Sequence, residues 1–239
     1  MYLFGYPYYG YGFYFDPTYI LIIIGAVISL IASAKVKSTY AKYSTVRSMS
    51  GYTGASVADA ILRRSGIYDV RIEHISGNLT DHYDPRSKVL RLSDSVYNSN
   101  SVAAIGVAAH ECGHAIQHAK GYAPLTIRSA IVPVVNFGSS ISWFLILAGL
   151  FITNGSGLIT LGIILFSTAV IFQLVTLPVE FNASRRALAI LGDGLIVNTE
   201  VKDARKVLSA AALTYVAGAI ASILQLLRLI ILFGGRNRD

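Results

Sequence analysis

The sequence contains a single cysteine, Cys112, and only five histidines. One cysteine excludes an intrachain disulfide and any cysteine-rich metal site. Charged residues are also scarce, at 14% of the chain, whereas a typical soluble domain has about 25%. The net charge is +7, but no basic–aromatic motif of the kind that binds nucleic acid accompanies it. We therefore expect no nucleic-acid partner.

The missing charges leave three long apolar runs. No charged side chain occurs in residues 17–34, 129–179 or 207–227. A helix needs about 20 mainly apolar residues to cross a bilayer. The sequence therefore predicts an integral membrane protein, in which the 129–179 run makes two crossings joined by a turn at residues 154–157. Long helices buried in a soluble core are the alternative, and runs of this length disfavour it.

The remaining residues divide the chain into polar and apolar parts. Residues 35–130 are polar enough to fold in water, with a short helix expected at 56–65 and strands at 69–75 and 88–92. The expected order is a Tyr/Gly-rich tail (1–17), a first transmembrane helix (18–34), the polar domain (35–130), helices at 131–153 and 158–178, a charged helical segment (179–206) and a fourth apolar segment (207–233).

The basic residues predict the orientation in the membrane. Seventeen of the twenty Lys and Arg residues lie in residues 35–128 and 185–206, so this side is expected to be cytoplasmic and the N-terminus outside, in a plasma membrane. The tail has no basic residue, which argues against a cleavable signal peptide. Arg228 interrupts the fourth segment, and four crossings would place Arg236 and Arg238 outside; whether this segment fully crosses is left open.

The most informative pattern is His110-Glu111-Cys112-Gly113-His114, an H-E-x-x-H motif. It lies in an apolar stretch, 102–119, that predicts a helix, so both histidines fall on one helix face. This arrangement binds zinc in metalloproteases, with the glutamate as general base. The alternative is that the two histidines are solvent-exposed and bind no metal. It would not explain Glu111, because an unpaired charge in an apolar stretch is costly. Cys112 is expected to pack rather than to react.

A catalytic zinc ion needs a third protein ligand. His118 continues the histidine row, but a rise of about 1.5 Å per residue places it ~12 Å from the first histidine along the axis, too far for one ion. We expect it to contact a ligand residue or substrate, or only to occupy the helix end. Glu180 is the preferred candidate, because it is the sole acid in residues 112–192 and follows the third apolar segment. Alternatively, Glu180 is an acid at the membrane interface, and His74 or His82 is the third ligand.

These features together resemble a known family. An apolar helix, a polar insert with HECGHAIQH (110–118), two further apolar helices and then EFNASR (180–185) are similar to the membrane-bound neutral zinc metallopeptidases of the YugP-like group, relatives of the CAAX-prenyl-protease and HtpX-like gluzincins. The resemblance covers residues 18–230. It implies one zinc ion per chain, held by His110, His114 and Glu180. It also implies a mainly α integral membrane protein, with about four transmembrane helices and a small α+β zincin-like cytoplasmic domain.

One position departs from the pattern of these relatives. The related gluzincins carry E-x-x-x-D after the intervening helices, and the aspartate steadies a ligand histidine. Here that position is Ser184, which would accept a histidine N–H more weakly, with Asn182 or Asp193 as alternatives. Histidines that match His118 occur in the relatives, which fits a role other than that of ligand.

The resemblance implies a mechanism. Zinc would lower the pKa of a water molecule toward ~7, and Glu111 would take its proton and pass it to the leaving amine. An oxyanion donor is also expected, with Tyr215, Arg185, Arg186 or His118 as candidates. Because Glu180 follows the third apolar segment closely, the site is expected at the cytoplasmic membrane surface. The expected partners are the bilayer and a peptide or membrane-protein substrate; the sequence singles out no regulatory or oligomeric partner.

Peptide substrates of such enzymes bind in extended form along the edge of a sheet. Lys88–Ser93 directly precedes the motif helix and is predicted to supply this edge, where Arg91 is a candidate for contact with substrate although the pattern favours a solvated arginine. An ordinary structural strand with a solvated Arg91 is the alternative.

Three other functions compete with proteolysis. A transporter or channel is disfavoured, because the first three apolar segments have no ionisable residue before Glu180. A zinc-binding scaffold without proteolytic activity leaves Glu111 without a purpose, and structural zinc sites tend to have four protein ligands. A zinc hydrolase that acts on a non-peptide amide, such as a lipid amidase, stays open because H-E-x-x-H defines the water activation and not the bond that is cleaved.

Overall fold

Four long helices dominate the fold. The computed structural model describes residues 16–153 and 155–234, so most of the Tyr/Gly-rich tail, Asn154 of the expected turn and the last five residues lie outside it. Within the described residues, four helices are long and apolar enough to cross a membrane. They are α1 (Tyr19–Ser44), α4 (Ala123–Phe151), α5 (Ser156–Ile190) and α6 (Asn198–Phe233). The prediction of a mainly helical multi-pass membrane protein is thereby confirmed.

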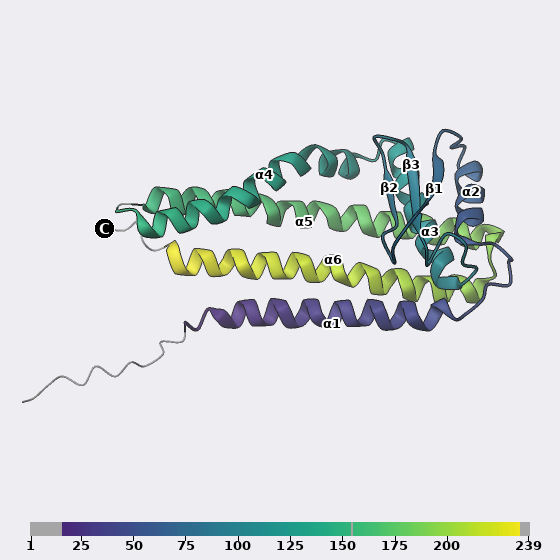
Figure 1. Cartoon of the computed structure of the whole chain (residues 1–239), viewed down its shortest axis with the longest axis horizontal. Coiled ribbons are helices and arrows are strands. Elements are labelled where there is room, and N and C mark those ends of the chain that lie inside the picture. Colours follow the sequence, from purple (N-terminus) through teal and green to yellow (C-terminus); the bar gives the residue numbers. More distant parts are fainter. Residues whose placement is uncertain (1–15, 154, 235–239) are drawn as a thin grey trace, which may run out of the picture.

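The four helices form an elongated bundle with a small domain at one end (Figure 1). α1 and α6 lie side by side, while α4 and α5 form a hairpin. The helices are longer than the apolar runs of the sequence, since α1 continues to Ser44 and α5 continues through Pro178 to Ile190. About 20 residues suffice to cross a bilayer, so the additional turns extend to the small domain.

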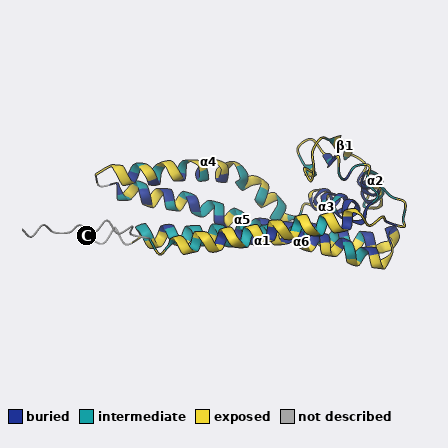
Figure 2. Cartoon of the chain, turned by 60° about the horizontal axis from the view of Figure 1, so that its bottom comes forward, coloured by how far each residue is buried: buried dark blue, intermediate teal, exposed yellow. Residues whose placement is uncertain are grey.

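Large apolar side chains are exposed along the bundle. Figure 2 shows exposed residues along α1 and α4, and Leu30 and Phe144 are 69% and 73% exposed. Apolar patches of this extent are rare on soluble monomers and mark contact with a membrane or a protein. Together with the length of the helices, they fit a bundle that is covered by lipid.

The small domain contains a three-stranded sheet in the order β1-β3-β2. The strands are β1 (Arg71–Ile75), β2 (His82–Asp84) and β3 (Val89–Ser93). β3 pairs in parallel with β1 and antiparallel with β2, so it is the central strand. The prediction that Lys88–Ser93 supplies the open edge is therefore wrong. β3 is buried at four of its five residues, as expected of a strand with neighbours on both sides, whereas β1 and β2 form the two edges.

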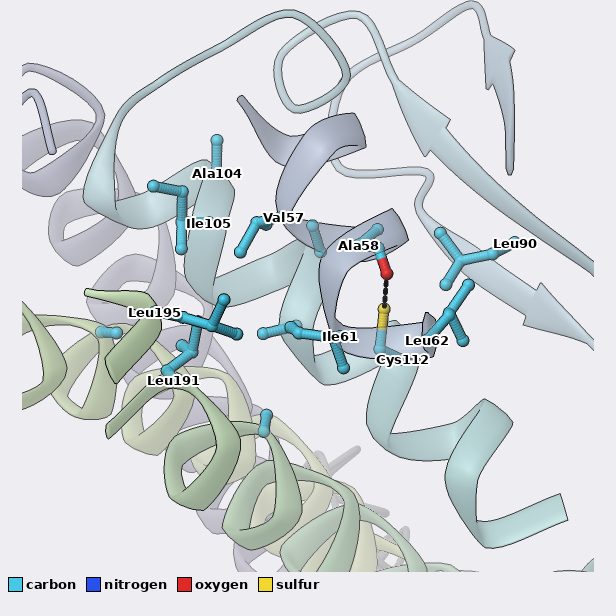
Figure 3. Packing of buried hydrophobic residues seen from close by; sticks show 14 of the residues in the cluster. Val57, Ala58, Ile61, Leu62, Leu90, Ala104, Ile105, Cys112, Leu191 and Leu195 are labelled. Atoms are coloured by element: carbon cyan, nitrogen blue, oxygen red, sulfur yellow. Dashed lines mark hydrogen bonds between the residues drawn. The ribbon is translucent and has the colours of Figure 1, made fainter. Parts of the chain in front are cut away.

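The motif helix α3 (Val102–Ala119) packs one face into an apolar core. Figure 3 shows α2 (Gly54–Arg64) lying against it, with the Cys112 thiol 3.6 Å from the Ala58 carbonyl oxygen. The other members of the core that the figure labels come from α2, α3, β3 and the segment after α5; they are Val57, Ile61, Leu62, Leu90, Ala104, Ile105, Leu191 and Leu195. Cys112 therefore packs, as predicted, and the opposite face of α3 is left for chemistry.

Arg228, the charge that interrupts the fourth apolar segment, has partners at the start of α1. Its guanidinium lies 3.2 Å from the Asp16 carboxylate, donates to the Thr18 hydroxyl at 3.1 Å and covers the Tyr19 ring. Pairing of this kind lowers the cost of an ionisable group within an apolar helix. It also joins the start of α1 to the last turns of α6.

The burial of Cys112 leads to a labelling prediction. Its side chain is fully buried, and burial raises the pKa of the thiol. We expect folded protein to react with a maleimide at least ~100-fold more slowly than unfolded protein, because reaction requires an accessible thiolate. Intact-mass measurement over time gives both rates, and Cys112→Ala shows the background. Equal rates in folded and unfolded protein would contradict the packing of α3 against α2.

Candidate metal centre

Two helices bring three potential metal ligands together. α3 contributes His110 and His114 from successive turns, and α5 contributes Glu180; their ligand atoms all lie within 4.8 Å of one another. The Glu180 Oε2 atom is 3.2 Å from His110 Nε2 and 3.5 Å from His114 Nε2. All three side chains are at most 13% exposed. The sequence separates these residues by an entire apolar hairpin, and the fold makes them neighbours.

Each histidine is held through its second ring nitrogen. His114 Nδ1 lies 3.0 Å from Gln117 Oε1, and Gln117 Nε2 donates to the Val179 carbonyl at 2.8 Å. Because the Gln117 amide must donate to that carbonyl, its oxygen faces His114, which carries its proton on Nδ1. His110 Nδ1 lies 3.0 Å from the Ser184 hydroxyl. Nε2 is thus the nitrogen of each ring that faces Glu180, and once deprotonated it can bind a metal ion.

This donor set fits a zinc ion. Ligands about 2.05 Å from a tetrahedral ion are about 3.3 Å from one another, and the two Nε2–Oε2 separations, 3.2 and 3.5 Å, bracket that value. Two neutral imidazoles and one carboxylate also form a ligand set known from catalytic zinc sites, which keep a fourth position for water. The second-nitrogen contacts of both histidines are those that metal-ligating histidines usually make.

Arg128 balances the charge of Glu180. Its guanidinium donates to Glu180 Oε1 at 3.1 Å, on the oxygen that does not face the histidines. Arg128 and Glu180 are the charges that directly precede and follow the charge-free run 129–179. The ion pair therefore closes the base of the α4–α5 hairpin, and the candidate metal centre lies where the apolar part of the hairpin ends.

Glu111 lies beside the three ligands but points to the sheet edge. Its Oε2 accepts the backbone N–H of Tyr83, on β2, at 3.0 Å. Burial raises the pKa of Glu111, and the nearby His110 and His114 oppose this shift. A carboxylate with a raised pKa is suited to take up and release a proton near neutral pH.

The His114 pKa is raised, although burial alone would lower it. Burial favours the neutral imidazole, but the hydrogen bond to Glu180 and the negative charges of Glu111 and Glu180 outweigh it, so the pKa is raised. The carboxylates thus make this imidazole more basic, and a basic nitrogen is a better metal ligand.

A cavity of about 270 Å³ opens beside the ligands. Glu111, His114 and Glu180 line it together with Arg128, Tyr215 and β2 residues. His82 and Tyr83 border it on β2, and burial raises the pKa of Tyr83 to about 12, so its hydroxyl, which lies 2.8 Å from His118 Nδ1, stays protonated. The cavity thus combines carboxylates, a guanidinium and the Tyr215 side chain beside the candidate metal ligands.

The other residues singled out from the sequence lie at different distances from the ligands. His118 is exposed and its Nδ1 lies 2.8 Å from the Tyr83 hydroxyl. Asn182 acts through Gln117, whose Nε2 donates to it at 3.0 Å. Arg91 pairs with Glu73 and Asp84 on the sheet. Arg185 is exposed, Asp193 uses its backbone oxygen to accept from Arg64, and His74 pairs with Asp94. His82 contacts Arg91 and lines the cavity beside the ligands.

Two residues that contact the candidate ligands, Gln117 and Arg128, were not predicted from the sequence. Gln117 is a polar residue three positions after His114 on the same helix face, and this spacing was a usable signal. Arg128 could have been found as the partner of Glu180, because the two charges flank one charge-free hairpin.

Comparison with known proteins agrees with this geometry. Residues 18–234 match a family described as "Putative neutral zinc metallopeptidase". "Putative membrane protease YugP" of Bacillus subtilis (strain 168) is 51% identical over 224 residues, which cover 92% of this chain and 99% of that protein. No solved structure matches the chain significantly. The resemblance to the YugP-like group is confirmed.

The backbone contact between α3 and α5 leads to a second prediction. A Cβ at Gly113 would lie 3.0 Å from the Ala183 Cα and would overlap its carbonyl. We expect Gly113→Ala to reduce stability by about 1–3 kcal/mol, because the two helices must separate. Gly157→Ala, on α5 with nothing near its Cβ, is the matched control and should melt like wild type. Equal melting temperatures for both variants in detergent would refute the close approach.

Proposed function

The chain belongs to the neutral zinc metallopeptidase family, and on that premise we propose that it is a zinc-dependent membrane endopeptidase. The observation that carries the proposal is the convergence of His110, His114 and Glu180, with Glu111 beside them on the same cavity. The proposed metal ligands are these three residues, and the proposed general base is Glu111.

The chemistry divides between the metal and the protein. A bound zinc ion supplies Lewis acidity, which polarises a peptide carbonyl and makes a water molecule more acidic. Glu111 accepts a proton from that water and delivers it to the nitrogen of the leaving amine. Its burial supports this role, since the raised pKa brings proton uptake closer to neutral pH. Arg128 and Tyr215 line the cavity as hydrogen-bond donors toward the oxygen of the scissile carbonyl.

Four residues around the ligands keep them in position. Ser184 and Gln117 orient the two imidazoles, and Arg128 orients the Glu180 carboxylate. Ser184 takes the place that an aspartate holds in the related gluzincins. A hydroxyl accepts a hydrogen bond more weakly than a carboxylate, so Ser184 would hold the His110 ring less firmly than an aspartate. Asn182 supports Gln117.

The substrate would bind along β2 rather than β3. Of the two edge strands, β2 is the one beside Glu111, and its Tyr83 N–H points away from β3 to that carboxylate. An extended peptide that adds to this edge would take up that N–H, and Glu111 would be released toward the water. His82, Tyr83 and Pro85 line the cavity from this side.

The site is proposed to act at the cytoplasmic face of the membrane. The small domain and the basic residues of 35–128 lie at the same end of the bundle, which the positive-inside rule assigns to the cytoplasm. The Arg128–Glu180 pair places the metal centre at the end of the apolar hairpin. Membrane proteins cleaved close to the bilayer are the proposed substrates.

Zinc content and cleavage by the detergent-purified full chain test the proposal. Wild type should hold about one zinc ion and cleave a casein-type or membrane-anchored substrate. Glu111→Gln should keep the metal and lose cleavage by at least ~100-fold, because it removes proton transfer alone. Glu180→Ala should weaken zinc binding, since a ligand is lost and Arg128 loses its ion-pair partner.

Asp59→Asn, an exposed carboxylate on α2, is the control and should retain both properties. A zinc content of Glu180→Ala equal to that of wild type would refute the assignment of Glu180 as a ligand. Normal zinc without cleavage of either substrate would refute the peptidase activity in favour of a scaffold or of another amide hydrolase.

The role of Gln117 is tested separately. Gln117→Leu removes the acceptor for His114 Nδ1, and we expect zinc affinity to fall by roughly 10–100-fold, the usual effect of losing such a partner. Competition with a chelator measures the affinity, and the melting temperature of metal-free protein shows whether the fold is retained. Gln225→Leu makes the same change on α6 beside Ile22 and Gly25. Equal zinc affinity in the two variants would show that Gln117 does not position His114.

A further inference from the structure

A groove of about 640 Å³ lies between α1 and α6, away from the metal centre. Its walls come from one face of each helix: Lys35, Ser38, Thr39, Lys42 and Tyr43 on α1, and Lys206, Ser209, Ala210 and Leu213 on α6. None of these residues lines the cavity beside Glu111. The groove is therefore separate from the cavity of the chemistry proposed above.

The charge that lines the groove is entirely positive. Three lysines line it, and no acidic residue does. Lys206 pairs with Asp203 at 2.8 Å, but within the described residues no ion pair joins Lys35 or Lys42. No acid occurs in the sequence between Asp16 and Asp59, so α1 itself offers none. Two of the three ammonium groups thus have no carboxylate partner.

Two of the lysines converge on one aromatic ring. Lys42 Nζ and Lys206 Nζ lie 5.4 and 5.6 Å from the centre of the buried Tyr43 ring. The ring draws both cations toward it, although the two like charges repel each other. An anion near both ammonium groups would remove this repulsion. The hydroxyls of Ser38 and Thr39 on the same wall are further donors for it.

One end of the groove meets the apolar part of the bundle, because α1 and α6 run antiparallel and Lys35 and Leu213 therefore lie at the same end. Lys35 is the first charge after the charge-free run 17–34, and Leu213 lies within the run 207–227. Lys35 and Lys42 are seven residues apart on one helix, about 10 Å along its axis. The polar layer of one leaflet is roughly 5–8 Å thick, so the lysines span the depth of the lipid head groups.

We propose that this groove binds an anionic phospholipid of the membrane. The phosphate lies between Lys35, Lys42 and Lys206, and an acyl chain follows Leu213 into the apolar part of the bundle. Positive charge at the head-group level together with an apolar wall below it recognises both parts of such a lipid. Tyr43 also packs against Ala103 at the start of α3, so the lipid would stabilise the contact between the bundle and the metal-binding domain.

The experiment measures the melting temperature of the full-length protein in zwitterionic detergent. Phosphatidylglycerol, phosphatidylcholine and inorganic phosphate are titrated separately, and native mass spectrometry counts bound lipid. We expect a saturable rise in melting temperature with phosphatidylglycerol, with one lipid bound, and no rise with the other two. An equal rise with phosphatidylcholine would overturn the role of the charge, and an equal rise with inorganic phosphate would replace the lipid by a free anion.

A matched pair of double variants assigns the effect to the groove. Lys35→Ala/Lys42→Ala should bind phosphatidylglycerol roughly 30-fold more weakly. Lys37→Ala/Lys202→Ala removes the same charge from exposed positions of the same two helices outside the groove, and should change the affinity less than about threefold. Equal losses in both variants would overturn the proposal in favour of general surface charge. Neither variant touches the zinc ligands, so this result is independent of the peptidase assay.

Discussion

The buried carboxylate of Glu180 connects the parts of this protein. Oε2 faces the two histidines of α3, Oε1 accepts from Arg128 of α4, and the residue itself belongs to α5. The side chain is only 4% exposed, and a charge buried to that extent is tolerated only when it is well paired. The same group therefore joins the small domain to the helical hairpin and completes the candidate metal centre.

α3 serves two purposes because its two faces differ. One face carries Ala104, Ile105 and Cys112 into the core with α2 and β3, and these contacts fix the helix. The other carries the histidines and Glu111 toward α5 and the sheet edge. Apolar packing holds the position of the helix on one side, so the polar side chains on the other meet their partners with little adjustment. Gly113 lets the backbones of α3 and α5 approach closely between these faces.

Features that depend on neighbouring residues could be predicted from the sequence. The apolar runs predict the long helices, and the spacing of His110 and His114 places both on one face of α3. The contacts of Gln117 and Arg128 were not predicted, because they join residues 62 and 52 positions apart. The edge strand was predicted wrongly for the same reason. Pairing order depends on how β1 and β2 return to β3, which the alternation of residues within one strand does not determine.

The order of the ligands along the chain also affects how the protein matures. Synthesis runs from the N-terminus, so His110 and His114 are made before the α4–α5 hairpin, and Glu180 follows only after it. The ligand set is complete once this hairpin has entered the bilayer and returned to the side of the small domain. A nascent or wrongly inserted chain would thus lack the complete candidate metal centre, so assembly of the centre depends on correct insertion of the hairpin.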